Sequence, residues 1–172
     1  YKTLVNQYGY NPANIYVLMS DGTNPGIDTS SGTSSNVDLD DDGIADIDYA
    51  ATKSNVINVF NQLADKLTEE DYLSVYTIDH GGLDSSRNES YLVLWNGMYI
   101  YANEFSELVK SVNTQATNIV MGQCNSGGFI DYFKNSPNIC ISTACAKNEY
   151  SFAMTGGLYD EYVYYWTNSH VT

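Results

Sequence analysis

Residues 73–82 read LSVYTIDHGG, and residues 118–128 read NIVMGQCNSGG; these two stretches carry the clearest indication of the fold class. Each begins with a short apolar run rich in β-branched or aromatic side chains. Each then reaches a chemically reactive side chain, His80 or Cys124, close to glycines. A run of this kind predicts a buried strand that ends at a turn.

The surrounding sequence alternates such strands with amphipathic segments. An Asn-Gly pair at residues 96–97 also predicts a β-hairpin between residues 91–94 and 98–101. Buried strands that alternate with helices predict an α/β fold, with a mostly parallel sheet, helices on both faces and a small hairpin insertion. The expected strands are 15–19, 73–78, 118–122 and 139–144, and the expected helices are 50–67, 103–112 (with Asn103 as N-cap), 128–134 and 157–166.

Length and composition limit the organisation and the partners. The 172 residues, 43% of them hydrophobic, predict a single domain over residues 1–172. The net charge of −14 argues against nucleic acid as a partner, because phosphate binding needs basic clusters. Apolar runs no longer than about six residues exclude a membrane-spanning helix. Because the chain starts with Tyr1 rather than Met, we expect it to be part of a longer protein.

Three candidate site residues follow predicted strands: Asp21, His80 and Cys124. In a parallel sheet the carboxyl ends of the strands meet at one edge, roughly 5 Å apart for neighbours. A thiol needs a base or a positive neighbour to become a thiolate near neutral pH. His80 and Cys124 therefore predict a nucleophile and its acid/base partner.

Each residue alone has a simpler explanation. A cysteine at the end of a buried strand is usually a small core residue, and a histidine beside glycine is usually a turn residue. The ordered pair, at successive strand ends with glycines nearby, favours catalysis over these explanations. His170, the other histidine, lies two residues from the end of the chain and is a poor candidate.

A resemblance to a known family rests on the same stretches. Residues 75–82, VYTIDHGG, resemble the His-Gly motif of the legumain-like cysteine peptidases, which belong with the caspases, clostripains and gingipains. Residues 119–127, IVMGQCNSG, resemble their Cys-x-Ser-Gly motif. The caspase pattern, with a histidine about 50 residues before the cysteine, is a related layout.

The resemblance implies a caspase-like fold and a cysteine endopeptidase that acts on peptides or proteins without an organic cofactor. Cys124 would attack the scissile carbonyl, and His80 would act as general acid/base. The backbone N–H groups of Gly81 and Cys124 would form the oxyanion hole.

The resemblance also implies a substrate pocket, to which we assign Asp21, Ser142, Ser151 and Asp160. Legumain-like enzymes have Glu-Ala before the cysteine and Glu after it, whereas this chain has Gly122-Gln123 and Asn125. A preference for Asn at the P1 position is therefore not implied. Asp160 and Glu161 could supply an acidic pocket for Lys or Arg, or they could be solvated helix residues.

An acidic stretch at residues 38–49 is an insertion relative to the family. Its D-x-D-x-D-G spacing is that of an EF-hand loop, in which glycine permits the sharp turn. Position 12, however, is Tyr49 instead of Glu, and the alternative is a solvated acidic loop. We predict a calcium site with the ligands Asp38, Asp40, Asp42, the Ile44 carbonyl, Asp46 and Asp48.

Two other functions are consistent with the same sequence. A transamidase would pass the acyl group to an amine instead of water, and a non-catalytic module would only bind in a calcium-dependent way. The presence of both His80 and Cys124 argues against the second. A weak calcium loop suits calcium-rich extracellular fluid, so we expect a secreted or cell-surface protein. The sequence does not specify an oligomeric state.

Overall fold

The computed structural model describes residues 1–154 and 160–169 of the chain. Its contacts form two compact units. The first unit comprises Tyr1–Val59 with Trp95–Met98, and the second comprises Phe60–Leu94 with Tyr99–Thr172. The expectation of a single domain over residues 1–172 stays a prediction.

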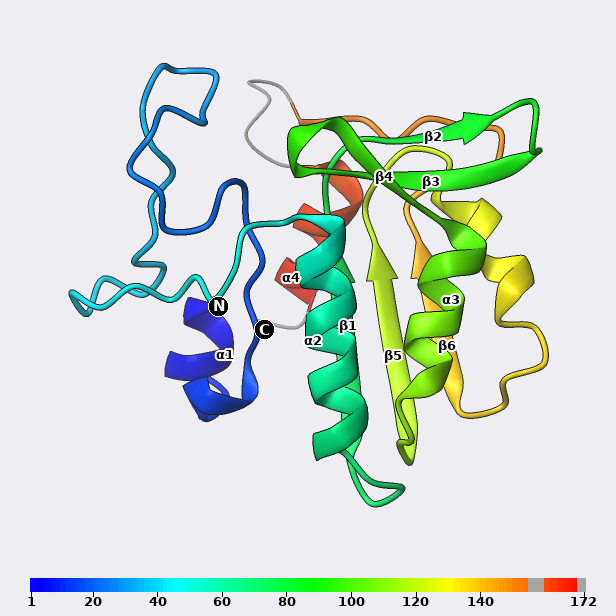
Figure 1. Cartoon of the computed structure of the whole chain (residues 1–172), viewed down its shortest axis with the longest axis horizontal. Helices are drawn as coiled ribbons and strands as arrows, with labels where there is room; N and C mark the ends of the chain where they lie inside the picture. The colour runs from blue at the N-terminus through cyan, green and yellow to red at the C-terminus, as the bar shows by residue number, and fades with distance from the viewer. Residues whose placement is uncertain (155–159, 170–172) are drawn as a thin grey trace. The chain divides into compact units, whose positions relative to one another are not determined.

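The second unit contains the predicted parallel sheet, drawn as three neighbouring strands in Figure 1. Its strand order is β1-β5-β6, and both pairings are parallel. The predicted α/β class is therefore confirmed. The strands are β1 (Tyr72–Thr77), β5 (Ala116–Met121) and β6 (Ile139–Thr143).

Helices of the second unit cover both faces of this sheet. α3 (Ala102–Ser111) lies in front of it in Figure 1. α4 (Glu161–Ser169) packs on the opposite face, where the Trp166 and Tyr76 rings are 6.2 Å apart. The core on the α3 side includes Phe105 and Phe129, whose rings meet edge to face at 5.8 Å.

A second, antiparallel sheet contains the predicted hairpin. Its strand order is β2-β3-β4. The turn follows from the sequence, because Asn96 and Gly97 both have φ of 66°, which this kind of turn requires. No local signal predicted β2, since its two glycines have low strand propensity. The strands are β2 (Gly81–Asp84), β3 (Glu89–Leu94) and β4 (Met98–Tyr101), with the 3-10 turn η2 (Trp95–Gly97) between the last two.

The first unit differs from expectation at residues 15–19, which do not form a strand. Leu18 makes an isolated parallel bridge with Tyr49. The backbone N–H of Val17 donates to the Asp48 carboxylate at 2.7 Å, and its carbonyl accepts from the amide of Asp48. These groups are therefore already paired locally. The helical elements of this unit are α1 (Lys2–Asn6), η1 (Pro12–Asn14) and the start of α2 (Lys53–Lys66).

Three predicted helix boundaries are also corrected. Tyr101, not Asn103, is the N-cap of α3, because the Glu104 carboxylate accepts the Tyr101 amide at 3.0 Å. Residues 126–132 form a 3-10 helix, η3 (Ser126–Tyr132), where a helix over 128–134 was expected. Of the helix predicted at 157–166, residues 157–159 lie outside the described part, and α4 begins at Glu161.

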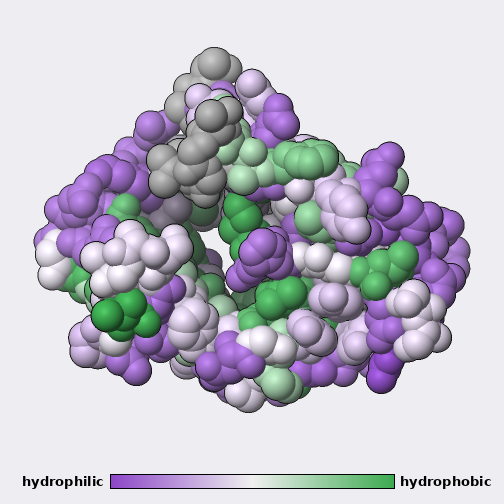
Figure 2. Space-filling view, turned by 90° about the horizontal axis from the view of Figure 1, so that it is seen from above, coloured by the Kyte–Doolittle hydropathy of each residue, from purple (hydrophilic) through white to green (hydrophobic). Residues whose placement is uncertain are grey.

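The surface agrees with the polar composition. On the face shown in Figure 2, hydrophobic residues form separate patches among hydrophilic ones. Among the described residues, no helix is both long enough and apolar enough to cross a bilayer.

Phe129 provides a test of this core. Its side chain is fully buried, so Phe129→Ala should lower the free energy of unfolding by about 3–5 kcal/mol. The neighbouring Ile130 is 38% exposed, and Ile130→Ala should cost less than about 1 kcal/mol. Urea denaturation of both variants measures the difference, and equal losses would contradict the assigned packing.

Candidate active site

His80 and Cys124 occupy equivalent positions beyond two paired strands. Thr77 and Met121 are register partners at the ends of β1 and β5, and each predicted catalytic residue follows its strand end by three positions. The pairing continues past the strands, because the Gly122 amide donates to the Thr77 carbonyl at 2.9 Å. The two segments therefore leave the same edge of the sheet side by side.

Gly81 brings these two segments into direct contact. A Cβ built on Gly81 would lie 2.4 Å from the backbone oxygen of Cys124 and 2.7 Å from Cγ of Gln123. Real Cβ atoms do not approach a backbone oxygen so closely, so only glycine fits without movement. The backbone beside His80 thus packs on the backbone of the predicted nucleophile.

Gln123 reinforces the same junction. Its side chain is 1% exposed, and its Oε1 accepts the Thr77 hydroxyl at 3.0 Å. The residue before the nucleophile is therefore tied to the end of β1. The sequence pointed to Gln123 only as a departure from the family motif.

The Cys124 thiol and the His80 imidazole have different surroundings. The half-buried thiol donates to the Ser151 carbonyl at 3.5 Å. The His80 side chain is exposed, while its backbone carbonyl accepts the Val93 amide at 2.9 Å. Among the described residues, no hydrogen bond joins imidazole and thiol; such contacts often tighten only when substrate binds.

Two backbone amides, of Gly81 and Cys124, form no hydrogen bond with the adjoining strands. The Val93-to-His80 hydrogen bond makes Gly81 and Leu92 a non-hydrogen-bonded pair of the antiparallel ladder, so the Gly81 N–H points away from β3. The Cys124 amide has no backbone acceptor within residues 1–154 and 160–169. Both groups are therefore available to an oxygen atom.

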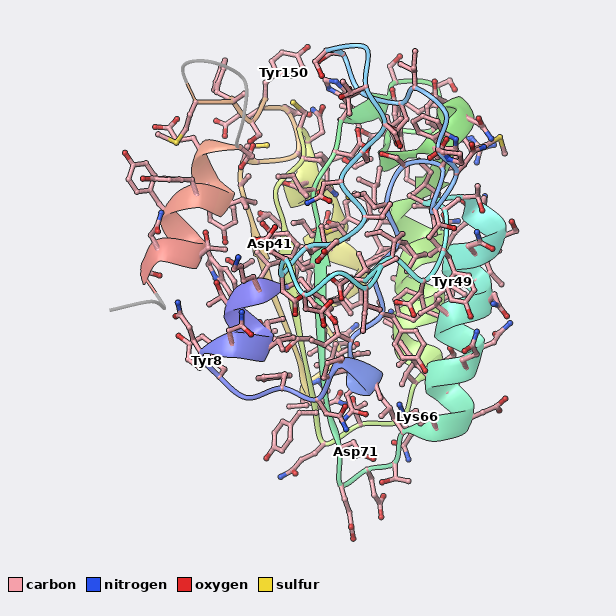
Figure 3. All side chains as sticks on the ribbon, turned by 90° about the vertical axis from the view of Figure 1, so that its left-hand side faces the viewer. Tyr8, Asp41, Tyr49, Lys66, Asp71 and Tyr150 are labelled. Atoms are coloured by element: carbon pink, nitrogen blue, oxygen red, sulfur yellow. The ribbon has the colours of Figure 1, made fainter. Side chains whose placement is uncertain are left out.

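A cavity of about 270 Å³ adjoins the nucleophile through Ser151. Tyr150, one of its lining residues, lies at the end of the molecule opposite Asp71, the residue that precedes β1 (Figure 3). The cavity thus shares the carboxyl end of the sheet with Cys124. It is lined by Ala144, Tyr150, Ser151, Phe152, Glu161, Tyr162 and Tyr165.

Three of the four predicted pocket residues lie at or beside this cavity. Ser151 lines it, and its hydroxyl donates to the Asp160 carboxylate. Ser142 is hydrogen-bonded to the hydroxyl of Tyr162, a lining residue. Asp160 itself is not among the lining residues.

Burial, and then the nearby Asp160 carboxylate, raise the pKa of Tyr76 on the adjoining sheet face to about 12, so this phenol is neutral at physiological pH.

The aromatic lining was not recognised as part of the site from the sequence. Residues 157–166 are visibly rich in tyrosine, and this was the available signal. Phe152 and Tyr150 lie in a segment without periodicity, so their shared cavity depends on tertiary contacts.

Asp21, the fourth predicted pocket residue, belongs to the first unit, where it faces Asp28. Partial burial, and then repulsion from Asp28, raise the pKa of Asp21 above its usual value. One carboxylate oxygen of each residue is buried and has no hydrogen-bond partner among the described residues.

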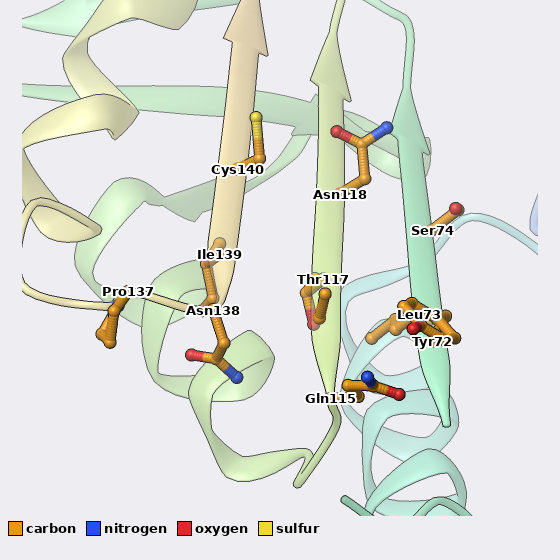
Figure 4. Close-up of a pocket in the computed structure, with 11 residues that line it drawn as sticks. Tyr72, Leu73, Ser74, Gln115, Thr117, Asn118, Pro137, Asn138, Ile139 and Cys140 are labelled. Carbon is orange, nitrogen blue, oxygen red and sulfur yellow. The ribbon is translucent and has the colours of Figure 1, made fainter. Parts of the chain in front are cut away.

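A larger cavity, of about 630 Å³, lies away from the reactive residues. Its lining comes from the amino-terminal parts of β1, β5 and β6 and the segments before them (Figure 4). Ser74, Asn118 and Cys140 lie in one row across the three strands there. His80 and Cys124 follow the opposite ends of the strands, so this cavity cannot serve them.

The acidic loop of the first unit brings three of its predicted metal ligands together. Asp38, Asp40 and Asp42 each offer an oxygen, and these oxygens lie within 4.8 Å of one another. The turn depends on Gly43, which has φ of 90° and donates its amide to Asp38 at 2.8 Å. Oδ1 of Asp40 is buried and has no hydrogen-bond partner in the described part of the chain.

The other predicted ligands lie outside that trio. Asp46 accepts the Leu39 amide at 2.6 Å, and Asp48 accepts the Val17 amide. The Ile44 side chain is 67% exposed, and its amide donates to Asp42. Burial, and then repulsion from Asp42 and Asp46, raise the pKa of Asp40, which is the direction expected of crowded carboxylates.

The three cysteines, Cys124, Cys140 and Cys145, are all free thiols. Cys145 contacts Ser126 and the Gln123 carbonyl, whereas Cys140 is exposed on β6. The thiol of Cys124 is therefore not blocked by a disulfide.

Comparison with known proteins identifies the family of the chain. The chain belongs to the Peptidase C13 family, whose family model matches residues 1–170. This is the legumain-like family expected from the His-Gly and Cys-x-Ser-Gly motifs, so that prediction is confirmed. Membership supports a cysteine-peptidase or transamidase-type function.

Among solved structures, the chain resembles protein GSU0716 from Geobacter sulfurreducens. The TM-score is 0.51 with 15% sequence identity, over 70% of this chain and 63% of that one. At this identity the likeness shows the fold alone. A search of curated proteins found no match.

Gly81 allows a test of the contact between the two segments. Gly81→Ala should lower the melting temperature by about 2–10 °C, because either the Cys124 backbone or β2 must move. Gly26→Ala is the control, since its Cβ would lie 3.2 Å from a side-chain oxygen of Asn24 and no backbone atom need move. Equal melting temperatures for the two variants would contradict the close approach.

Proposed function

We propose that this chain is a cysteine endopeptidase that cleaves peptide bonds through a thioester on Cys124. The observation that carries this proposal is the equivalent placement of His80 and Cys124 beyond register-paired strand ends, with Gly81 packed on the Cys124 carbonyl. A nucleophile and an acid/base group must share one site, and membership of a peptidase family supports the pairing.

The reaction needs four proton transfers at His80, two in forming the thioester and two in hydrolysing it. The Cys124 thiol gives its proton to the imidazole, and Sγ bonds to the scissile carbonyl carbon. The carbon–nitrogen bond breaks as the imidazolium protonates the leaving amine. Water then attacks the thioester and gives a proton to His80, and the departing thiolate recovers a proton as the carbon–sulfur bond breaks.

The developing negative charge falls on the carbonyl oxygen. We assign its stabilisation to the Gly81 and Cys124 amides, which the neighbouring strands leave available. Preorganised backbone donors of this kind contribute about 3–4 kcal/mol each to the barrier. The substrate pocket is assigned to the Ser151 cavity, with Ser142 and Asp160 holding its wall; a role for Asp21 stays a prediction.

We further propose that the acidic loop binds calcium. Asp38, Asp40 and Asp42 supply convergent oxygens, and the buried, unpartnered oxygen of Asp40 suits a cation. The Ile44 carbonyl, Asp46 and Asp48 are proposed to complete the ligand set after local adjustment. A loop of this kind suits calcium-rich extracellular fluid, and a secreted or cell-surface location is proposed on that basis.

The central test is a panel of fluorogenic peptides varied at P1. Cys124→Ala and His80→Ala should each lower kcat/KM at least about 1,000-fold, because the dyad acts as a unit. Cys140→Ala is the matched control, since that thiol is exposed on β6, and it should retain full activity. Adding a peptide amine and analysing products by mass distinguishes hydrolysis from transamidation.

Two outcomes would refute the peptidase proposal. One is a folded wild-type protein that cleaves no peptide and whose Cys124 is not labelled by a thiol-reactive peptide probe, as a binding module predicts. The other is full activity in the Cys124→Ala variant.

Calcium binding is tested by calorimetry and thermal melting. Calcium should raise the melting temperature, and Asp40→Asn should weaken binding at least about tenfold, because it removes a charged ligand. Asp65→Asn changes the net charge equally on an exposed part of α2 and should leave affinity unchanged. Equal affinities of these two variants, or no binding at millimolar calcium, would refute the site.

A further inference from the structure

We propose that Glu161 selects substrates with a cationic P1 side chain, Lys or Arg. This inference rests on the proposed peptidase function and names the substrate class of the same site. The cavity that adjoins Cys124 through Ser151 has aromatic lining residues and, among the described residues, one acidic lining residue, Glu161.

The cavity lies next to the nucleophile. The Cys124 thiol donates to the Ser151 carbonyl at 3.5 Å, and Ser151 lines the cavity. The neighbouring amide of Asn125 donates to the Glu149 carbonyl at 2.9 Å. Residues 149–151 therefore run along the nucleophile. Since Sγ attacks the carbonyl of the P1 residue, the adjoining cavity is placed to receive the P1 side chain.

Of the two neighbouring carboxylates, Asp160 and Glu161, the one at Asp160 is already hydrogen-bonded. Asp160 is engaged on both oxygens, because one accepts the Ser151 hydroxyl and the other accepts the Val163 amide at 3.1 Å in the first turn of α4. The Glu161 carboxylate forms no hydrogen bond or ion pair with any described residue. Asp160 thus holds the wall together, and Glu161 is the acidic group that a substrate can reach.

The wall that carries Glu161 is fixed by the backbone. The Glu161 amide donates to the Phe152 carbonyl at 2.9 Å, and Ala153 and Asp160 form an antiparallel bridge. The start of α4 is therefore joined to the segment that follows Ser151. This connection places Glu161 and the aromatic residues around one cavity.

The residues that line the cavity suit a cationic side chain. Four aromatic residues line the cavity, and the face of an aromatic ring attracts a cation, while Glu161 supplies the opposite charge; the four are Tyr150, Phe152, Tyr162 and Tyr165. A volume of about 270 Å³ accommodates a long side chain with an apolar stem. A short neutral side chain such as Asn would leave the aromatic walls unfilled. The net charge of −14 also favours the approach of cationic peptides.

The experiment compares matched substrates and matched variants. Peptides with Arg or citrulline at P1 have nearly the same shape and differ in charge. The wild type should cleave the Arg peptide with a kcat/KM at least about tenfold higher than that for the citrulline peptide. Glu161→Gln should lower kcat/KM for Arg and Lys peptides about 10- to 100-fold and leave the citrulline peptide unchanged, because only a charged contact is lost.

Glu107→Gln is the control for bulk charge, since it removes the same charge from the exposed face of α3. It should change kcat/KM for neither the Arg nor the citrulline peptide. Melting temperatures of both variants report on folding. The Glu161 inference is overturned, and the peptidase function stands, if the wild type cleaves peptides with neutral P1 residues best. The same holds if Glu161→Gln lowers kcat/KM equally for the Arg and citrulline peptides. If the wild type cleaves no peptide at any P1 residue, both proposals are overturned.

Discussion

The close approach of Gly81 to the Cys124 carbonyl depends on the register of two parallel strands and in turn positions the site. β1 and β5 pair residue for residue up to Thr77 and Met121, so the segments beyond them leave the sheet at the same level. A one-residue slip would turn every side chain to the other face and separate the two reactive groups. The absence of a side chain at Gly81 then lets the two backbones meet. Gln123, buried between them and bonded to Thr77, holds the junction from the other side.

Ser151 connects this junction to the adjoining cavity. Its carbonyl accepts the Cys124 thiol, while its hydroxyl reaches Asp160 at the start of α4. A displacement of α4 would therefore move Ser151 and change the hydrogen bond of the Cys124 thiol. Asp160 resembles a substrate-binding carboxylate in the sequence, yet its oxygens are committed to Ser151 and to the first turn of α4. Position in a motif and availability to a ligand are thus different properties.

The acidic loop shows the same contrast in the first unit. Six aspartates occur between residues 38 and 48 in addition to the glycine that permits the turn, but only three carboxylates converge. Asp46 and Asp48 bond to backbone amides of Leu39 and Val17 instead. The Asp46 bond organises the loop, and the Asp48 bond occupies the Val17 amide in the segment 15–19, which forms a single bridge rather than a strand. The loop chemistry therefore affects a segment that its apolar composition alone would place in the sheet.

The α/β class, the parallel strands β1, β5 and β6 and the Asn-Gly hairpin could be predicted from the sequence, and His80 and Cys124 could be singled out as the candidate catalytic pair. These follow from local signals, because apolar runs, turn residues and reactive side chains act over a few neighbouring positions. Three features could not be predicted in this way: β2 forms from a Gly-Gly segment, η3 is a 3-10 helix, and aromatic residues from two segments share a cavity with Glu161. Such features depend on which distant backbones approach one another and on which polar groups already have partners. No local pattern encodes either one, since both are fixed only when the strands are in register and the helices are packed.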